Sequence, residues 1–112
     1  MDEVLLVEMG QRIFERRRQL MLTQEQLAEQ AGLTPQTVST AELGKKAMRP
    51  ENIIKMCDAL EVSTDYLLRG KISPEDESAI CQKMSQLPPE QYHHLENIIN
   101  SFLAAVEEEK KA

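Results

Sequence analysis

Three polar side chains share one face of a short helix that the sequence predicts over residues 35–43. With Val38 facing inward, a helix of about 100° per residue places Gln36 and Thr40 near the opposite side, with Thr37 beside them. A glutamine amide can bond adenine N6 and N7 together, and a threonine can hydrogen-bond a base or touch a thymine methyl group. These residues therefore offer hydrogen-bonded recognition of base edges, and we expect Gln36, Thr37 and Thr40 to make base contacts.

Basic residues lie close to this helix. Residues 10–55 hold eight Lys and Arg against five Asp and Glu, although the whole chain carries a formal net charge of −6. Much of the acidic excess lies in residues 72–112, where eight acidic residues stand against three Lys. A local excess of this size is compatible with ordinary surface variation, and its position beside the helix favours phosphate binding. The expected phosphate contacts from this group are Arg16, Lys45, Lys46 and Arg49.

The helix over residues 35–43 must be positioned by a second helix just before it. Thr23 and Gln26 form a capping box at the start of that earlier helix. Gly32 can take the positive φ that ends it. Thr34 then caps the next helix, with Pro35 at the first position, where a missing N–H costs nothing. Two short helices joined in this way predict a helix-turn-helix, whose second helix is shaped to enter a DNA major groove.

The rest of the chain also reads as helical. Apolar residues at helical spacing and caps predict helices over 6–21, 50–60 and 64–70 around the helix-turn-helix. Ser73, Pro74 and Asp76 form a second capping box, and Pro88-Pro89 separates two further amphipathic helices. The expected fold class is all-α, a five-helix domain followed by two C-terminal amphipathic helices. The expected divisions are a DNA-binding domain over 6–70, a joint over 71–74, a helical dimerisation segment over 75–108 and a frayed tail over 109–112.

The last predicted helix carries a broad apolar stripe on one face. A five-helix domain closes its own core, so this stripe needs another cover. Three covers are open: a second copy of the chain, the chain's own domain, or a different protein. We favour a homodimer, with an interface made by Tyr92, Leu95, Ile98, Ile99, Phe102 and Val106.

Two opposite charges fall on inward faces. Arg17 lies on the apolar stripe of the first helix, between Ile13 and Leu20, and Glu42 lies on the inward face of the helix over residues 35–43. An unpaired buried charge is too costly to keep. The sequence therefore predicts a structural ion pair between Arg17 and Glu42.

The spacing over Gly10 to Gly70 resembles the DNA-binding domain of the phage-repressor, or Cro/Xre, type. The matching positions are Gly10, Gln24, Leu27-Ala28, Ala31-Gly32, Ser39, Glu42, Gly44-Lys45, Ala59-Leu60, Val62-Ser63, Asp65 and Leu67-Leu68. The resemblance implies the five-helix fold and the same Arg17–Glu42 pair. It also implies that Gln24 bonds a backbone phosphate and braces the recognition helix, and we add Ser39 to the phosphate contacts. Pro35 and Leu43 depart from the pattern, because polar residues are common at both positions.

These patterns predict a sequence-specific transcriptional regulator, a homodimeric repressor that reads a palindromic operator in double-stranded DNA. The alternative is an antitoxin-like or partner-binding regulator whose C-terminal helices engage a different protein. The sequence shows no nucleophile motif, phosphate loop or metal-ligand spacing, since His93 and His94 are adjacent. We therefore expect no enzyme activity, no cofactor, no metal and no small-molecule ligand. Cys57 and Cys81 are expected to be reduced and partly buried, in a cytoplasmic protein without a membrane span.

Overall fold

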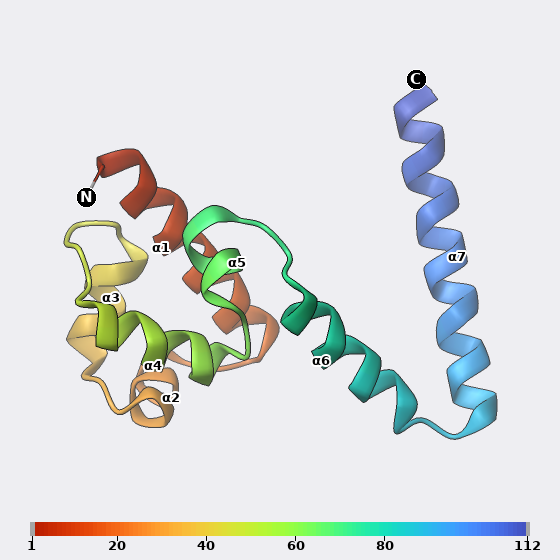
Figure 1. Ribbon diagram of the computed structural model, residues 1–112, viewed down its shortest axis with the longest axis horizontal. Helices are drawn as coiled ribbons and strands as arrows, with labels where there is room; N and C mark the ends of the chain where they lie inside the picture. The colour runs from red at the N-terminus through yellow and green to blue at the C-terminus, as the bar shows by residue number, and fades with distance from the viewer. Residues whose placement is uncertain (1, 112) are drawn as a thin grey trace. The chain divides into compact units, whose positions relative to one another are not determined.

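The computed structural model describes residues 2–111, which form seven α-helices and no strand (Figure 1). The expected all-α fold is confirmed. The helices are α1 (Glu3–Gln19), α2 (Gln24–Ala31), α3 (Pro35–Glu42), α4 (Pro50–Leu60), α5 (Thr64–Arg69), α6 (Pro74–Ser85) and α7 (Pro89–Lys111). The chain divides into two compact units, the first ending at Glu77 and the second beginning at Ser78.

The helix ends of the helix-turn-helix follow the predicted caps. The Thr23 backbone N–H donates to Gln26 Oε1 at 2.9 Å, and the Gln26 N–H donates to Thr23 Oγ1 at 3.0 Å. Gly32 ends α2 with a φ of +70°. The Thr34 hydroxyl caps α3 by accepting from the Thr37 N–H at 3.1 Å. These bonds satisfy backbone donors that a helix leaves free at its first turn.

Both predicted limits of the first helix differ from the structure. α1 begins at Glu3 rather than at residue 6, because Asp2 supplies an N-cap that accepts from the Val4 N–H at 2.9 Å. α1 also stops at Gln19, and the chain turns at Met21, where φ is +59°. Acidic Glu3 in the first turn suits the positive end of the helix dipole.

The expected frayed tail over 109–112 does not hold for residues 109–111. α7 continues through Lys111, and its last turn carries Lys110 and Lys111. Cations at a helix C-terminus interact favourably with the dipole, which stabilises that turn. Ala112 lies outside the described residues.

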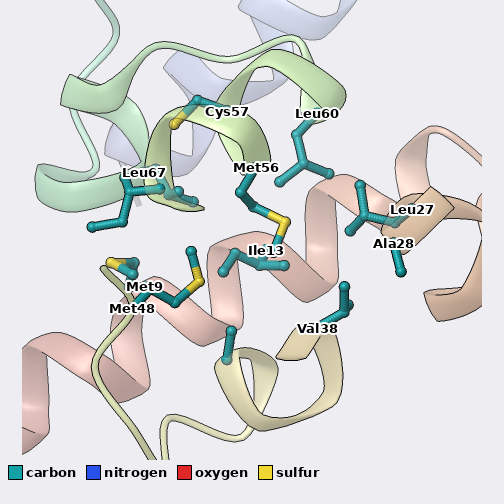
Figure 2. Close-up of a cluster of buried hydrophobic side chains, with 12 residues drawn as sticks. Met9, Ile13, Leu27, Ala28, Val38, Met48, Met56, Cys57, Leu60 and Leu67 are labelled. Carbon is teal, nitrogen blue, oxygen red and sulfur yellow. The ribbon is translucent and has the colours of Figure 1, made fainter. Parts of the chain in front are cut away.

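The core of the first unit is built almost entirely from aliphatic and sulfur-containing side chains. The largest side chains that are fully enclosed come from all five helices: Ile13, Leu27, Val38, Met56, Leu60 and Leu67. Figure 2 shows them around Ile13 of α1, with Met9 and Met48 nearby. Met48 precedes α4 and is 8% exposed, so it anchors the loop after α3 to the core.

Gly10 brings α1 and α3 into close contact. A Cβ atom built on Gly10 would lie 2.4 Å from the Ala41 carbonyl oxygen and 2.5 Å from that of Glu42. Both distances are shorter than any real contact of this kind, so only glycine allows this approach. The close crossing fixes the C-terminal end of α3 against α1.

The division between the units falls within α6, later than the expected joint over 71–74. The first turn of α6 belongs to the first unit, because Asp76 accepts hydrogen bonds from Ser63 as well as from Ser73. The backbone from Gly70 to Ser73 forms no helix.

The second unit carries the predicted apolar stripe on α7. Within that unit no residue of α7 is buried. Phe102 is 67% exposed and Ile98 is 57% exposed, whereas Leu95 and Val106 are half-buried. Within the second unit, the stripe therefore has no complete cover.

Candidate nucleic-acid interface

α3 presents the predicted polar face outward because its opposite face is held in the core. Val38 is fully buried and Ala41 is 5% exposed. Gln36 is exposed, and Thr37 and Thr40 are half-buried. The Gln36 amide Nε2 donates to Thr40 Oγ1 at 3.3 Å, which orients the amide along the helix. This arrangement leaves hydrogen-bonding groups on the outer surface of α3.

The structure brings the three expected base-contact residues and two of the expected phosphate-contact residues together around one open depression. Its wall on the α3 side contains Gln36, Thr37, Thr40 and Ala41. The other wall comes from the loop after α3 and from α4, and contains Lys46, Ala47, Met48, Arg49 and Asn52. Polar side chains with donors and acceptors therefore face the same space as two basic side chains.

Asn52 is a residue that the sequence analysis missed. It lies in the first turn of α4, after Pro50, and it is half-buried at the edge of the depression. Asparagine can bond adenine N6 and N7 as glutamine can. In the sequence, only the position of Asn52 near a helix N-terminus, just after the basic residues, points to DNA contact. That indication is weak without knowledge of the tertiary packing.

The basic loop is held in place by backbone geometry. Gly44 has a φ of +67°, and a Cβ there would lie 2.8 Å from the Val7 Cα. The Lys45 N–H donates to the Thr40 carbonyl oxygen at 3.3 Å, which closes α3. Lys45, Lys46 and Arg49 are all exposed, while the intervening Met48 is buried. The three cations thus stand on the surface of a loop that the core anchors.

Arg17 and Glu42 form the expected ion pair. Arg17 Nε lies 2.7 Å from Glu42 Oε2, and Arg17 Nη2 donates to Glu42 Oε1 at 3.1 Å. The two side chains are 10% and 5% exposed. Arg17 Nη1 also donates to the Leu22 carbonyl oxygen at 2.9 Å. This bidentate pair ties α1 to the end of α3 and gives hydrogen-bond partners to the buried guanidinium and carboxylate groups.

Gln24 completes the same network. Its Nε2 donates to Glu42 Oε1 at 3.1 Å, so the first residue of α2 also contacts α3 through Glu42. The amide oxygen of Gln24 and the remaining amide hydrogen stay available, because the side chain is half-buried. Gln24 is therefore oriented at the N-terminus of α2, where free N–H groups favour anions.

One of the expected phosphate contacts, Arg16, is hydrogen-bonded within the domain. Arg16 Nε donates to the Leu60 carbonyl oxygen at 2.9 Å, and Nη1 donates to Gln19 Oε1 at 3.2 Å. The Arg16 guanidinium therefore binds the C-terminal end of α4, and we leave it out of the proposed phosphate contacts. Ser39, another expected phosphate contact, is half-buried on α3. Leu43, which follows it by about one helical turn, is 59% exposed.

Within residues 2–111, the two groups with a shifted pKa are Cys57 and Asp76, and both lie outside this interface. Burial raises the pKa of the Cys57 thiol to about 11, with smaller contributions from the Asp58 and Asp76 charges. Cys57 is 4% exposed, whereas Cys81 is exposed, so the expected partial burial is wrong for Cys81. Across residues 2–111, no group of three His, Cys, Asp or Glu could hold a metal ion. Within the same range, no helix has the length and apolar character needed to cross a membrane.

Comparison with known proteins shows similarity to helix-turn-helix proteins. The helix-turn-helix family matches residues 13–67. The transcriptional repressor RstR of the cryptic phage CTXphi, from Vibrio cholerae serotype O1, is 26% identical over 99 residues, which cover 87% of this chain and 88% of that protein. The restriction-modification controller protein C.AhdI from Aeromonas hydrophila has a crystal structure that is 37% identical, with a TM-score of 0.54, over 55% of this chain and 94% of that chain.

The c2 repressor of Salmonella phage P22 is 35% identical over 65 residues, which cover 58% of this chain. The repressor structure solved in complex with a synthetic operator is 35% identical, with a TM-score of 0.55, over 56% of this chain and 96% of that chain. The chain spans 30% of the full-length P22 repressor. Residues 13–67, which the family matches, contain the caps of α2 and α3, the Arg17–Glu42 pair and the depression beside α3. The chain therefore belongs to the helix-turn-helix family that includes the phage repressors.

Proposed function

We propose that the protein is a sequence-specific transcriptional repressor that binds double-stranded DNA as a homodimer in the cytoplasm. The observation that carries the proposal is the depression beside α3, where Gln36 and Thr40 face the same space as Lys46 and Arg49. A helix presenting such groups on a helix-turn-helix suits the major groove. The P22 relative, which was solved in complex with a synthetic operator, supports the same class of ligand.

Base reading is assigned to the outer face of α3. The Gln36 amide can bond an adenine edge, while Thr37 and Thr40 can hydrogen-bond a base or contact a thymine methyl group. The contact between Gln36 and Thr40 at 3.3 Å restricts the amide before DNA arrives, which lowers the entropy cost of binding. Asn52, on the opposite wall, is a further candidate for contact with a base or sugar.

Phosphate contacts are assigned to groups on both sides of α3. Lys45, Lys46 and Arg49 supply positive charge on the anchored loop, and Ser39 supplies a hydroxyl on α3. Gln24 supplies an amide at the N-terminus of α2 that Glu42 already orients. Such contacts fix register and contribute most of the salt-dependent affinity.

Dimerisation is assigned to α7. Its interface would comprise Tyr92, Leu95, Ile98, Ile99, Phe102 and Val106. The three of these that are most exposed within the second unit are Phe102, Ile98 and Tyr92, at 67%, 57% and 38%. Pairing about a twofold axis would bury this stripe, because such an axis joins the same surface of two copies. Two copies would then present two α3 helices to a palindromic site.

The proposal is tested first by base readout. An operator is selected from random duplexes, and binding of Gln36→Ala and Thr40→Ala is measured on that operator and on random DNA. Each variant should lose about 1–3 kcal/mol on the operator and little on random DNA. Gln30→Ala, an exposed glutamine on α2 outside the depression, is the matched control. Equal losses on both DNAs would show that these side chains do not read bases.

The second test uses salt. The slope of log affinity against log salt should fall by about 0.9 for each phosphate interaction that a substitution removes, so Lys45→Ala, Lys46→Ala and Arg49→Ala combined should reduce it by about 2.7. A control with the same charge change replaces Lys71, Lys83 and Lys110, all outside the interface, with Ala. A triple variant that keeps the parent slope would place the basic loop away from DNA.

The third test concerns the dimer. Phe102→Asp places a charge in the proposed seam and should give a folded monomer with reduced operator affinity, measured by sedimentation equilibrium and DNA titration. Asn100→Asp, about 160° around α7 from Phe102, is the control and should remain dimeric. A Phe102→Asp variant that stays dimeric at micromolar concentration would assign the stripe to another contact.

A further inference from the structure

Asp76 joins the starts of two helices. Its Oδ1 accepts from the Ser63 backbone N–H at 2.9 Å, and its Oδ2 accepts from the Ser63 hydroxyl at 2.6 Å. Oδ2 also accepts from the Ser73 backbone N–H at 2.9 Å and from the Ser73 hydroxyl at 3.0 Å. Ser63 is the N-cap of α5, and Ser73 directly precedes α6. One carboxylate therefore binds the first turns of α5 and α6 to each other.

Low solvent exposure and the charge of the carboxylate strengthen these hydrogen bonds. Ser63 is 8% exposed and Ser73 is 9% exposed, so water competes poorly for their donors. Burial by itself would raise the pKa of Asp76, but the hydrogen bonds from Ser63 and Ser73 outweigh it and lower the pKa from 3.8 to about 2. The carboxylate is thus ionised, and its four hydrogen bonds are charge-assisted, at any pH near neutrality.

Asp76 lies in the first turn of α6, just before the division between the two units, so its hydrogen bonds bear on the direction of α6. The backbone from Gly70 to Ser73 forms no helix, so this joint alone does little to fix the direction of α6. α6 then runs without a break from Pro74 to Ser85, and the division between the two units falls after Glu77. A helix is stiff over this length, so holding its first turn constrains the direction of the remainder.

We propose that Asp76 is a positioning residue, which fixes α6 to the DNA-binding domain and thereby sets the half-site spacing that the homodimer accepts. The proposal rests on the proposed function. In a dimer joined through α7, each recognition helix is connected to the twofold axis through α6. Both helices must reach grooves about 34 Å apart, so a fixed joint favours one spacing, whereas a free joint accepts several.

The first experiment measures the joint without DNA. Residual dipolar couplings of backbone amides report whether α6 shares the alignment of α1–α5. In the parent chain one alignment should fit both, and in Asp76→Ala the couplings of α6 should be reduced and need a separate fit. Glu75→Gln, the neighbouring acid in the first turn, is the control and should behave as the parent. Asp76→Asn serves as a milder second variant. An Asp76→Ala chain that keeps the common alignment would overturn the proposal.

The second experiment varies the operator. Half-sites of the selected operator are moved closer or farther apart by one or two base pairs, and affinity is measured for the parent, Asp76→Ala and Glu75→Gln. The parent and the control should lose about tenfold or more away from the preferred spacing, and Asp76→Ala about threefold or less. Affinity for an isolated half-site and the dimer dissociation constant should stay unchanged.

The outcomes separate this proposal from the proposed function. If the parent binds no DNA, the proposed function fails and the spacing role fails with it, while the dipolar couplings still decide whether Asp76 fixes α6. If the parent binds with a clear spacing preference and Asp76→Ala keeps that preference, the function stands and the positioning role is refuted. Loss of half-site affinity in Asp76→Ala would also refute it, because Asp76 would then act on the recognition surface.

Discussion

Replacing Arg17 with Ala should destabilise the first unit more than any exposed substitution of the same kind. The change leaves the Glu42 carboxylate buried, with a side chain only 5% exposed. Removing one partner of a buried ion pair costs about 3–5 kcal/mol. The Leu22 carbonyl oxygen also loses the hydrogen bond that Arg17 Nη1 donates to it at 2.9 Å, which adds about 1 kcal/mol to the destabilisation.

One contact opposes this loss. Gln24 still donates to Glu42 at 3.1 Å, which offsets about 1 kcal/mol. The expected total is therefore about 4 kcal/mol, a large share of a typical stability of about 5–15 kcal/mol. For a domain of this size such a loss lowers the melting temperature by about 15–30 °C.

Urea unfolding followed by circular dichroism measures the change. Arg18→Ala is the control, because the guanidinium groups of Arg17 and Arg18 both lie over the Phe14 ring, at 5.3 Å and 5.7 Å from its centre, but Arg18 is exposed. It should cost less than about 1 kcal/mol. Replacing both Arg17 and Glu42 with apolar residues should recover part of the loss, since no charge is then stranded. The reasoning is refuted if Arg17→Ala and Arg18→Ala unfold at the same urea concentration.

Three further predictions concern other contacts. Gly10→Ala should lower the free energy of unfolding by about 3 kcal/mol or more, because the new Cβ clashes with backbone atoms. Gly32→Ala has open space around its Cβ and should cost only about 1–2 kcal/mol, from its left-handed backbone; denaturant titration measures both changes. Asp76, with a folded pKa lowered from 3.8 to about 2, stabilises the fold above pH 4 and loses that contribution as pH falls toward 2, so Asp76→Asn should flatten the unfolding free energy across this window. In the native protein at pH 8, Cys81 should be alkylated and Cys57, whose pKa is raised to about 11, should not; rapid labelling of Cys57 in a mass spectrum would contradict its burial.

Much of the fold is readable from the sequence because its signals act over one helical turn. Thr23, Thr34 and Ser63 cap helices through a backbone N–H three residues on, and each was recognisable from its neighbours alone. The 3.6-residue period likewise placed Val38 inward and Gln36 outward. These features depend on local geometry, so no knowledge of distant residues is needed to predict them.

The long-range ion pair was also predictable, but only in part. Burial of both Arg17 and Glu42 follows from periodicity, and two buried opposite charges require each other. The sequence does not say which other groups join them, and Gln24 reaches Glu42 through the packing of α2 on α3. Periodicity put Arg16 on an outer face, yet its guanidinium binds the Leu60 carbonyl, 44 residues away.

Tertiary structure alone decided where the helices meet at their ends. The capping box of Ser73 and Asp76 is local, whereas the bonds that Asp76 accepts from Ser63 span 13 residues, across α5 and the irregular backbone from Gly70 to Ser73. The depression beside α3 includes Asn52 for the same reason, because the fold of the loop after α3 sets its distance from Gln36. The sequence by itself determined which helices form and which faces they bury, since neighbouring side chains specify both. The contacts between helix ends depend on loop paths and close packing that no local pattern encodes.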